Sequence, residues 1–231
     1  DNINYNNSSP IDRKINTSIS IINDRPNIPV TNKTNLTKAI VPDLILLNQY
    51  NNTGLVDATT TYNSLINKVT NNVRPNRIDN IDNIINNPTN KQKRDYINFV
   101  SGVMIPMLLY KDQSVELSYY YNDKNIPDIK FIHSELSKIC SKSNLKDLEV
   151  PVTYLEAYKD FVYTCDFYIN FLNSIINRQD DPLRAQIGLN LYDELYNSKI
   201  KMVREYIKLV KADNIHFTNK ESGYIFEVRP S

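Results

Sequence analysis

Few residues in this chain have the chemistry of a catalytic or metal site, and their spacing is the first evidence about function. The two cysteines, Cys140 and Cys165, both fall in apolar segments with helical periodicity. A buried free thiol is the usual state of such a cysteine, and two cysteines are too few for a disulfide framework. We therefore expect both to be free thiols, which favours a reducing compartment.

The two histidines give no catalytic or metal signature. His133 lies seven residues before Cys140 in a predicted helix, so the two would share a face about 10 Å apart along the axis, too far for an activated thiolate. No other Cys or His stands at zinc-ligand spacing from His133 or His216. We expect both to be hydrogen-bonded or exposed, with no metal and no cofactor.

Two pairs of adjacent carboxylates are the remaining candidates for acid–base chemistry. Asp193 and Glu194 fall inside a predicted helix, where adjacent side chains point apart, so they make a poor catalytic pair. Asp180 and Asp181 precede Pro182, which is typical of a helix start with a carboxylate cap and a proline in the first turn. No catalytic residue is predicted, and we expect a protein that is not an enzyme.

Phosphate and nucleic-acid recognition are also poorly supported. Four glycines leave little room for a glycine-rich phosphate loop, and Gly188 lies inside a predicted helix. Lys91, Lys93 and Arg94 cluster at a predicted helix start, where they would serve either a nucleic-acid contact or a solvated helix end. The net charge of +1 gives no electrostatic reason for nucleic acid. We expect a solvated helix end and no direct nucleic-acid contact.

The tyrosines allow two interpretations. Because Tyr is large and has a polar tip, it is enriched at protein interfaces, but a chain with 16 Tyr also uses it in ordinary core packing. Core packing is the favoured interpretation. The residues concerned are the run Tyr119, Tyr120 and Tyr121 and the row Tyr154, Tyr158, Phe161 and Tyr168.

These residues depend on a helical body predicted at 91–212. A helix at 91–110 is apolar all round in its second half, hence buried, and Pro106 should bend or break it. The segment 113–121 fits a strand or a short helix equally well. A helix at 127–143 has Pro127 in its first turn and one apolar stripe, made by Ile129, Ile132, Leu136 and Ile139.

The strongest pattern is a pair of long helices at 151–178 and 182–211. A four-residue joint between them predicts antiparallel neighbours. The second helix has apolar residues every four positions, and the pattern then slips in phase. The first set is Leu183, Ile187, Leu191 and Leu195, and the second is Ile200, Val203, Ile207 and Val210.

The first 90 residues differ from the rest in composition. Most of the asparagines lie there, but only Tyr5, Tyr50 and Tyr62 of the 16 Tyr and 7 Phe do, so the main core should belong to the second part. An AT-rich genome explains the asparagines best. Residues 1–34 predict an arm that is either disordered or extended against another surface, because they lack helical periodicity and contain three prolines.

Between this arm and the body we expect peripheral helices and a connector. Helices are predicted at about 36–50 and 55–72. An Asn-rich connector follows, bracketed by Pro75 and Pro88, with one small apolar face that would form one weak helical turn or two. Its apolar residues are Ile78, Ile81, Ile84 and Ile85.

The end of the chain predicts a β-hairpin. Two short β-type segments at 215–218 and 224–229 flank a polar turn, and Gly223 stands where such a turn needs a positive φ. Because an isolated hairpin is marginal in water, it should dock on another surface.

The predicted fold class is therefore mainly α. It is a helical bundle with two long antiparallel helices, an extended N-terminal arm and a C-terminal β-hairpin. The boundaries are 1–34 for the arm, 35–90 for the peripheral helices and connector, 91–212 for the helical body, and 213–231 for the hairpin. The most apolar run, at 99–110, is too short to span a bilayer, so no membrane contact is expected.

This plan resembles the portal-adaptor, or head–tail connector, proteins of tailed bacteriophages. The resemblance lies in LKDLEVPVTYLEAYKDFVYTCDFYINFL followed by DDPLRAQIGLNLYDELYNSKIKMVREYIKLVK: an aromatic helix, a short acidic turn and a long helix with "LY" pairs. It implies a non-enzymatic ring subunit located in the virion, with a portal or tail protein and further copies of the chain as partners. The alternative is an intracellular protein-interaction module of an AT-rich host or a large DNA virus.

Overall fold

The computed structural model describes residues 35–39, 45, 70, 73–78, 80–108, 113–140, 145 and 148–227. Within these residues the protein is mainly helical, as predicted. The predicted arm at 1–34, most of the helices predicted at 36–50 and 55–72, and the last four residues lie outside the described part.

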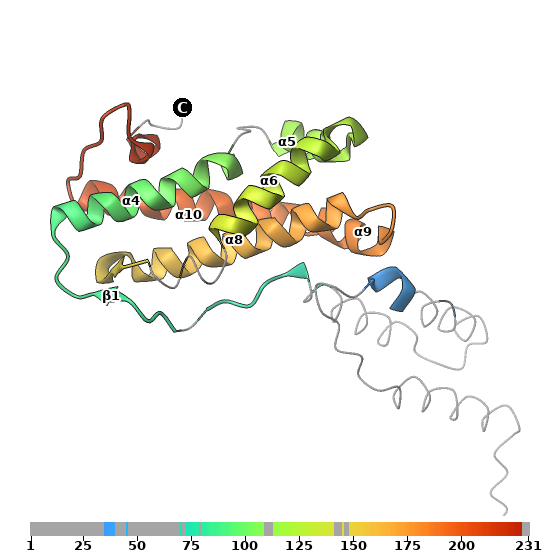
Figure 1. The fold of residues 1–231 in the computed structure, drawn as a ribbon, viewed down its shortest axis with the longest axis horizontal. Helices are drawn as coiled ribbons and strands as arrows, with labels where there is room; N and C mark the ends of the chain where they lie inside the picture. The colour runs from blue at the N-terminus through green and yellow to red at the C-terminus, as the bar shows by residue number, and fades with distance from the viewer. Residues whose placement is uncertain are drawn as a thin grey trace, which may run out of the picture.

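Figure 1 shows the arrangement of the described elements: α4, α8 and α10 run alongside one another, and α6 crosses α8. The elements in chain order are β1 (Ile84–Ile85), α4 (Asn90–Met104), α5 (Gln113–Tyr121), α6 (Ile126–Ile139), β2 (Val150–Pro151), α8 (Leu155–Ile176), α9 (Pro182–Asn190) and α10 (Tyr192–Ala212). Short 3-10 helices stand at Ile105–Leu108, Asp123–Asn125, Val152–Tyr154 and Ser222–Phe226.

Helix α8 lies at the centre of the body, in contact with α6, α9 and α10. Its large aromatic side chains explain this position, because burying a Phe or Tyr removes the most apolar area from water per residue. Twelve of its residues are buried, and among them are Tyr158, Phe161, Phe167, Tyr168 and Phe171. The row of aromatic residues predicted to pack in the core is therefore confirmed as buried.

The second long helix is divided in two. The predicted single helix at 182–211 ends at Asn190 and begins again at Tyr192, with Leu191 between them at φ −89° and ψ −1°. Helix α9 starts as predicted, because Asp181 caps it through the Arg184 amide at 3.3 Å and Pro182 opens the first turn. Gly188 lets α9 approach α8, since a Cβ at this position would overlap the Ser174 hydroxyl.

Contacts of α10 with α8 and with Tyr154, the residue just before α8, join early residues of one segment to late residues of the other. Three ring or cation contacts show the order: Tyr154 with Tyr206, Tyr168 with Lys199, and Phe171 with Tyr192.

The predicted phase slip in the apolar pattern of α10 is wrong. Of the second predicted set, only Val210 is buried; Ile200, Val203 and Ile207 are partly exposed. The buried stripe instead runs without interruption through Leu195, Lys199, Met202, Tyr206 and Val210. The predicted slip arose because the pattern was read from apolar residues alone, and one member of the stripe is a lysine.

Helix α4 begins within one residue of the predicted start at 91 and ends before the predicted bound at 110, at the break expected from Pro106. Thr89 forms a capping box with Gln92, and the α-helix stops at Met104, two residues before Pro106. The prediction that its second half is buried all round is only partly right. Phe99 and Ile105 are exposed, because that side of the helix is not covered by other described elements.

The ambiguous segment 113–121 is a helix, α5, and α6 follows it after a short 3-10 turn. Pro127 lies in the first turn of α6, as predicted. Of the predicted apolar stripe, Ile129 and Leu136 are buried, and Ile132 and Ile139 pack partly buried against the core.

The connector is extended and not helical. Ile84 and Ile85, predicted within a weak helical turn, form strand β1, which pairs in parallel with Val150 and Pro151 of β2. The Val150 amide also donates to the Asn83 carbonyl at 2.8 Å. β-Branched residues favour this conformation when a partner strand is available, and the partner lies far away in the sequence.

The predicted C-terminal β-hairpin is wrong for the described residues. Residues 215–218 are irregular, and Ser222–Phe226 forms a 3-10 helix that packs on α4. Gly223 is needed for a close approach and not for a positive φ, because a Cβ there would overlap the Phe217 ring. Its amide donates to the Asn98 side chain at 2.9 Å, so α4 holds the segment in place of a second strand.

No helix among the described residues is both long enough and apolar enough to cross a membrane.

Candidate functional site

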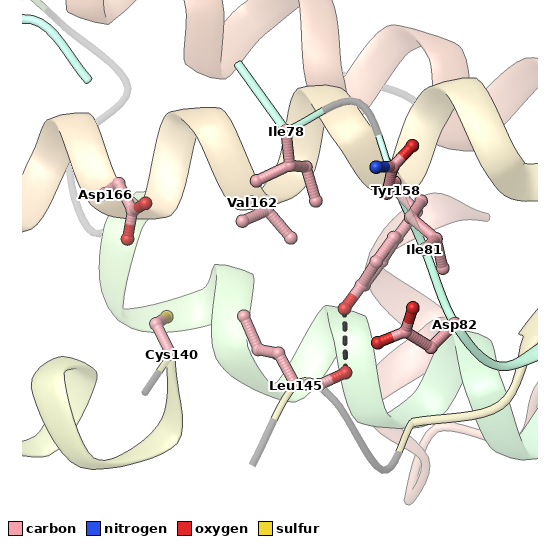
Figure 2. Close-up of a pocket in the computed structure, with 9 residues that line it drawn as sticks. Ile78, Ile81, Asp82, Cys140, Leu145, Tyr158, Val162 and Asp166 are labelled. Carbon is pink, nitrogen blue, oxygen red and sulfur yellow. Dashed lines mark hydrogen bonds between the residues drawn. The ribbon is translucent and has the colours of Figure 1, made fainter. Parts of the chain in front are cut away.

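A pocket of about 210 Å³ lies between the extended connector, the end of α6 and the middle of α8 (Figure 2). Its walls are mainly aliphatic, with two carboxylates among them. The described lining residues are Ile78, Asn80, Ile81, Asp82, Cys140, Leu145, Tyr158, Val162 and Asp166.

Tyr158 forms the most constrained polar group of this pocket. Its hydroxyl donates to the Leu145 carbonyl at 3.0 Å, as the dashed line in Figure 2 shows. Burial raises the pKa of Tyr158 to about 12, because the anion would lose its hydration in the protein interior. The phenol is therefore neutral at physiological pH and acts as a hydrogen-bond donor, not as a base.

The cysteines correct a prediction. Cys140 and Cys165 are buried as expected, but they are not free thiols: they form a disulfide between the end of α6 and the middle of α8. Their Cα atoms are 6.5 Å apart although 25 residues separate them in the sequence. Helix packing brings them together, which two isolated residues in separate helical patterns could not indicate. The expectation of a reducing compartment loses its basis.

The charged residues of the described pocket lining are both acidic. Among its described lining residues are the carboxylates of Asp82 and Asp166 and no Lys, Arg or His. Figure 2 shows Asp166 at the same end of the pocket as Cys140, and Asp82 at the other end, beside Tyr158. No group of three or more His, Cys, Asp or Glu among the described residues could hold a metal ion.

A buried ion pair is the main polar feature that the sequence did not indicate. The Lys199 ammonium contacts both Glu116 carboxylate oxygens at 2.5 and 2.7 Å and donates to the Met107 carbonyl at 3.2 Å. Both side chains are 2% exposed. Burial lowers the pKa of Lys199, and the Glu116 carboxylate opposes that effect. The available signal was the position of Lys199 on the buried stripe of α10.

Tyrosines surround this pair and complete its hydrogen bonds. The Tyr120 hydroxyl donates to Glu116 at 2.9 Å and is also hydrogen-bonded to the Tyr168 hydroxyl at 2.5 Å. Lys199 stands 5.3 Å from the centre of the Tyr168 ring. Burial and the Glu116 charge raise the pKa of Tyr192. We call Glu116, Tyr120, Tyr168, Tyr192 and Lys199 the charged cluster.

A second group of tyrosines contains no buried ion pair. The hydroxyls of Tyr96 and Tyr206 are hydrogen-bonded at 2.6 Å, and the Tyr154 hydroxyl donates to Asp213 at 2.8 Å. The Tyr96 and Tyr206 rings are stacked with their centres 6.3 Å apart. Burial raises the pKa of both Tyr96 and Tyr206. We call Tyr96, Tyr154, Tyr158 and Tyr206 the neutral cluster.

The acidic pairs behave as the sequence predicted. Asp193 accepts from the Gln113 side chain, whereas its neighbour Glu194 pairs with Arg74, so the two carboxylates have separate partners.

Of the three consecutive tyrosines at 119–121, Tyr120 is buried and Tyr121 is exposed.

The remaining candidates are not brought together. His133 is half-buried, and burial lowers its pKa. His216 is exposed, with its Nδ1 3.5 Å from Glu227. Two residues of the basic cluster are engaged in ion pairs with the C-terminal part of the chain, Lys93 with Asp213 and Arg94 with Glu221; Lys91 is exposed.

Asp181 does more than cap α9. Its carboxylate also accepts from the amides of Leu36 and Thr37, at 2.8 and 2.9 Å, and from the Thr37 hydroxyl at 2.7 Å. Burial alone would raise the pKa of Asp181, but these hydrogen bonds outweigh it and the pKa is lowered. One carboxylate thus caps two chain segments that are 144 residues apart in the sequence.

Comparison of the chain with family models, with curated proteins and with solved structures gives no match.

Proposed function

We propose that the protein is a non-enzymatic structural assembly protein. The observation that carries this proposal is the exposure of large apolar side chains on two consecutive helices. Val115 and Tyr121 of α5 are 52% and 58% exposed, and Phe131 of α6 is 67% exposed. Exposed aromatic side chains are typical of surfaces that contact other proteins, where Phe and Tyr are enriched.

The interior supports the same proposal. The most deeply buried charges, Lys199 and Glu116, bond to each other and to neighbouring groups of the body. The pair joins α5, which holds Glu116, to α10, which holds Lys199. This attachment of α5 to the body suits a subunit that presents α5 and α6 at a fixed place in an assembly.

More narrowly, we propose a head–tail connector or ring subunit of a virion. This rests on the resemblance of the segments 145–172 and 180–211 to portal-adaptor proteins of tailed bacteriophages. In a ring, each subunit uses two different surfaces and the head-to-tail contact closes by rotation. The partners would be further copies of this chain and a portal or tail protein.

Sedimentation of the full chain tests the proposal. We expect one closed oligomer with a mass several times the 26.8 kDa of the chain. Phe131→Ser should shift this species toward the monomer while leaving the circular dichroism spectrum unchanged. The matched control is Val152→Ser, which removes another exposed apolar side chain just before α8 and should assemble normally.

Two results would count against it. A wild-type chain that sediments as a monomer at every concentration tested would remove the ring. A Phe131→Ser variant that assembles like the wild type would show that α6 is not the contact surface.

A further inference from the structure

The exposed face of α10 is cationic in the second half of the helix. From residue 198 to residue 211, the exposed residues are Lys201, Arg204, Lys208 and Lys211, and no others. At 3.6 residues per turn these four positions fall within an arc of about 80°, and at 1.5 Å per residue they form a row about 15 Å long. We call these four residues the basic row.

Carboxylates neutralise only part of the basic row. Lys201 pairs with Asp160 at 2.8 Å and Lys208 pairs with Glu205 at 2.7 Å, and the two lysine side chains remain 63% and 70% exposed. Arg204 and Lys211 pair with no carboxylate among the described residues. Because like charges three or four residues apart on a helix repel each other, the row destabilises α10 unless an anion lies along it.

We infer that the basic row binds the phosphate backbone of duplex DNA without reading its sequence. Lysine and arginine side chains contact DNA phosphates, and such contacts position a protein on the duplex but carry no sequence information. A duplex presents one phosphate charge per about 1.7 Å of its axis, so a row of this length faces several phosphates. The helix and the duplex are both rigid, so neither has to be ordered on binding. This binding would not depend on the proposed assembly function.

The residues of the basic row favour a duplex over other polyanions. A single strand is held by bases that stack on aromatic side chains, and a membrane surface is held by apolar side chains that enter it. The centre of an interface with another protein is likewise rich in aromatic residues. The exposed positions of α10 from 198 to 211 have no aromatic or apolar side chain, and the apolar stripe of the helix is buried against the body.

The sequence did not single out this surface. The expectation of no nucleic-acid contact rested on the net charge of +1, which averages over the whole chain. The cations that the sequence did single out are less available, because Lys93 and Arg94 pair with carboxylates of the C-terminal part of the chain. The gathering of Lys and Arg along one helix face indicates a DNA contact, and it depends on the fold and not on the total charge.

The salt dependence of binding tests the basic row. The folded full chain is titrated into a short labelled DNA duplex, and fluorescence anisotropy gives the association constant as the salt concentration is raised. Contact with about four phosphates gives a slope of about −3.6 for log K against log salt, so the affinity should fall about 100-fold between about 50 and 200 mM salt. Two duplexes of unrelated sequence and equal length should bind equally well.

Charge-neutral variants locate the contact. Arg204→Gln with Lys211→Gln should lower the affinity at low salt by at least about 10-fold and reduce the slope by about 2, because two phosphate contacts are lost. The matched control is Lys124→Gln with Lys130→Gln, which removes the same charge from exposed positions between and within α5 and α6. The control should keep the slope and the affinity of the wild type, and both variants should keep its circular dichroism spectrum.

Three results would overturn the inference. The first is a wild-type chain that does not bind the duplex at low salt. The second is a slope that the α10 variant does not reduce, or that the control reduces equally, which would mean that the row is not the contact. The third is tighter binding to a single strand, to polyglutamate or to vesicles of anionic lipid than to the duplex, which would mean that the row takes a different polyanion.

Discussion

The neutral cluster and the charged cluster lie at opposite ends of the contact between α8 and α10, and both bury tyrosine hydroxyls. In the neutral cluster the hydroxyls of Tyr96 and Tyr206 are hydrogen-bonded to each other at 2.6 Å. At its edge the Tyr154 hydroxyl donates to Asp213, which also pairs with Lys93. In the charged cluster the tyrosines complete the hydrogen bonds of an ion pair that is itself 2% exposed.

The difference between the two clusters sets how much stability the protein loses when one residue of a cluster is replaced. A buried neutral hydroxyl that loses its partner leaves one unsatisfied donor or acceptor, which costs about 1–3 kcal/mol. A buried charge that loses its partner costs about 3–5 kcal/mol, because a full charge stays in a medium that solvates it poorly. The body should therefore tolerate changes in the neutral cluster and fail first in the charged one.

The largest effect should follow from breaking the ion pair. Lys199→Met leaves the Glu116 carboxylate buried without its cation, and we expect the free energy of unfolding to fall by about 3–5 kcal/mol in urea titrations. The double variant Lys199→Met, Glu116→Leu should be more stable than Lys199→Met alone. If the single variant loses less than Tyr206→Phe does, the comparison between the clusters is wrong.

The disulfide stands between the clusters along α8, since Cys165 lies between Tyr158 and Tyr168. Replacing it by Cys140→Ser with Cys165→Ser should lower the free energy of unfolding by about 3 kcal/mol, because the cross-link restricts the unfolded chain. The control is the wild type in reductant, which should unfold at the same urea concentration as the variant. Equal stability of the oxidised and reduced wild type would contradict the prediction.

Removing one hydroxyl from the neutral cluster should have a smaller effect. Tyr206→Phe leaves the Tyr96 hydroxyl without its partner, and we expect a loss of about 1–2 kcal/mol in the same titration. Tyr96→Phe with Tyr206→Phe removes both hydroxyls and should recover part of that loss. If the double variant loses more free energy of unfolding than the two single variants lose together, the hydroxyls have a further role.

The last effect concerns Asp181, at the end of the body nearer the charged cluster. Asp181→Asn keeps a good helix cap but removes the negative charge that faces the buried Arg184 guanidinium at 3.3 Å, and should cost about 1–3 kcal/mol at neutral pH. Because the pKa of Asp181 is lowered in the folded state, its contribution is present above the unfolded pKa near 4 and is lost as the pH falls through the folded pKa. Wild type and variant should therefore become equally stable in acid, as thermal unfolding at several pH values would show. If the difference in stability between the wild type and Asp181→Asn stays constant down to the lowest pH, the negative charge of Asp181 is not the cause of that difference.

Local chemistry accounts for what could be predicted from the sequence. The start of α9 at Asp181–Pro182, the end of α4 before Pro106 and the first turn of α6 at Pro127 follow from backbone rules that act over a few residues. The burial of the aromatic row of α8 follows from its size and spacing. The separate directions of Asp193 and Glu194 follow from helix geometry.

The tertiary structure decided everything that depends on partners far away in the sequence. Ile84 and Ile85 are extended because Val150 and Pro151 supply a partner strand. Residues 215–227 do not form a hairpin, and there the Asn98 side chain of α4 accepts from the Gly223 amide. Cys140 meets Cys165, and Lys199 is buried, only because the folded helices place a sulfur and a carboxylate beside them. The free energy of a buried thiol or ammonium group depends on the group that contacts it in the folded protein. The order of residues around the thiol or the ammonium group in the sequence does not identify that neighbour.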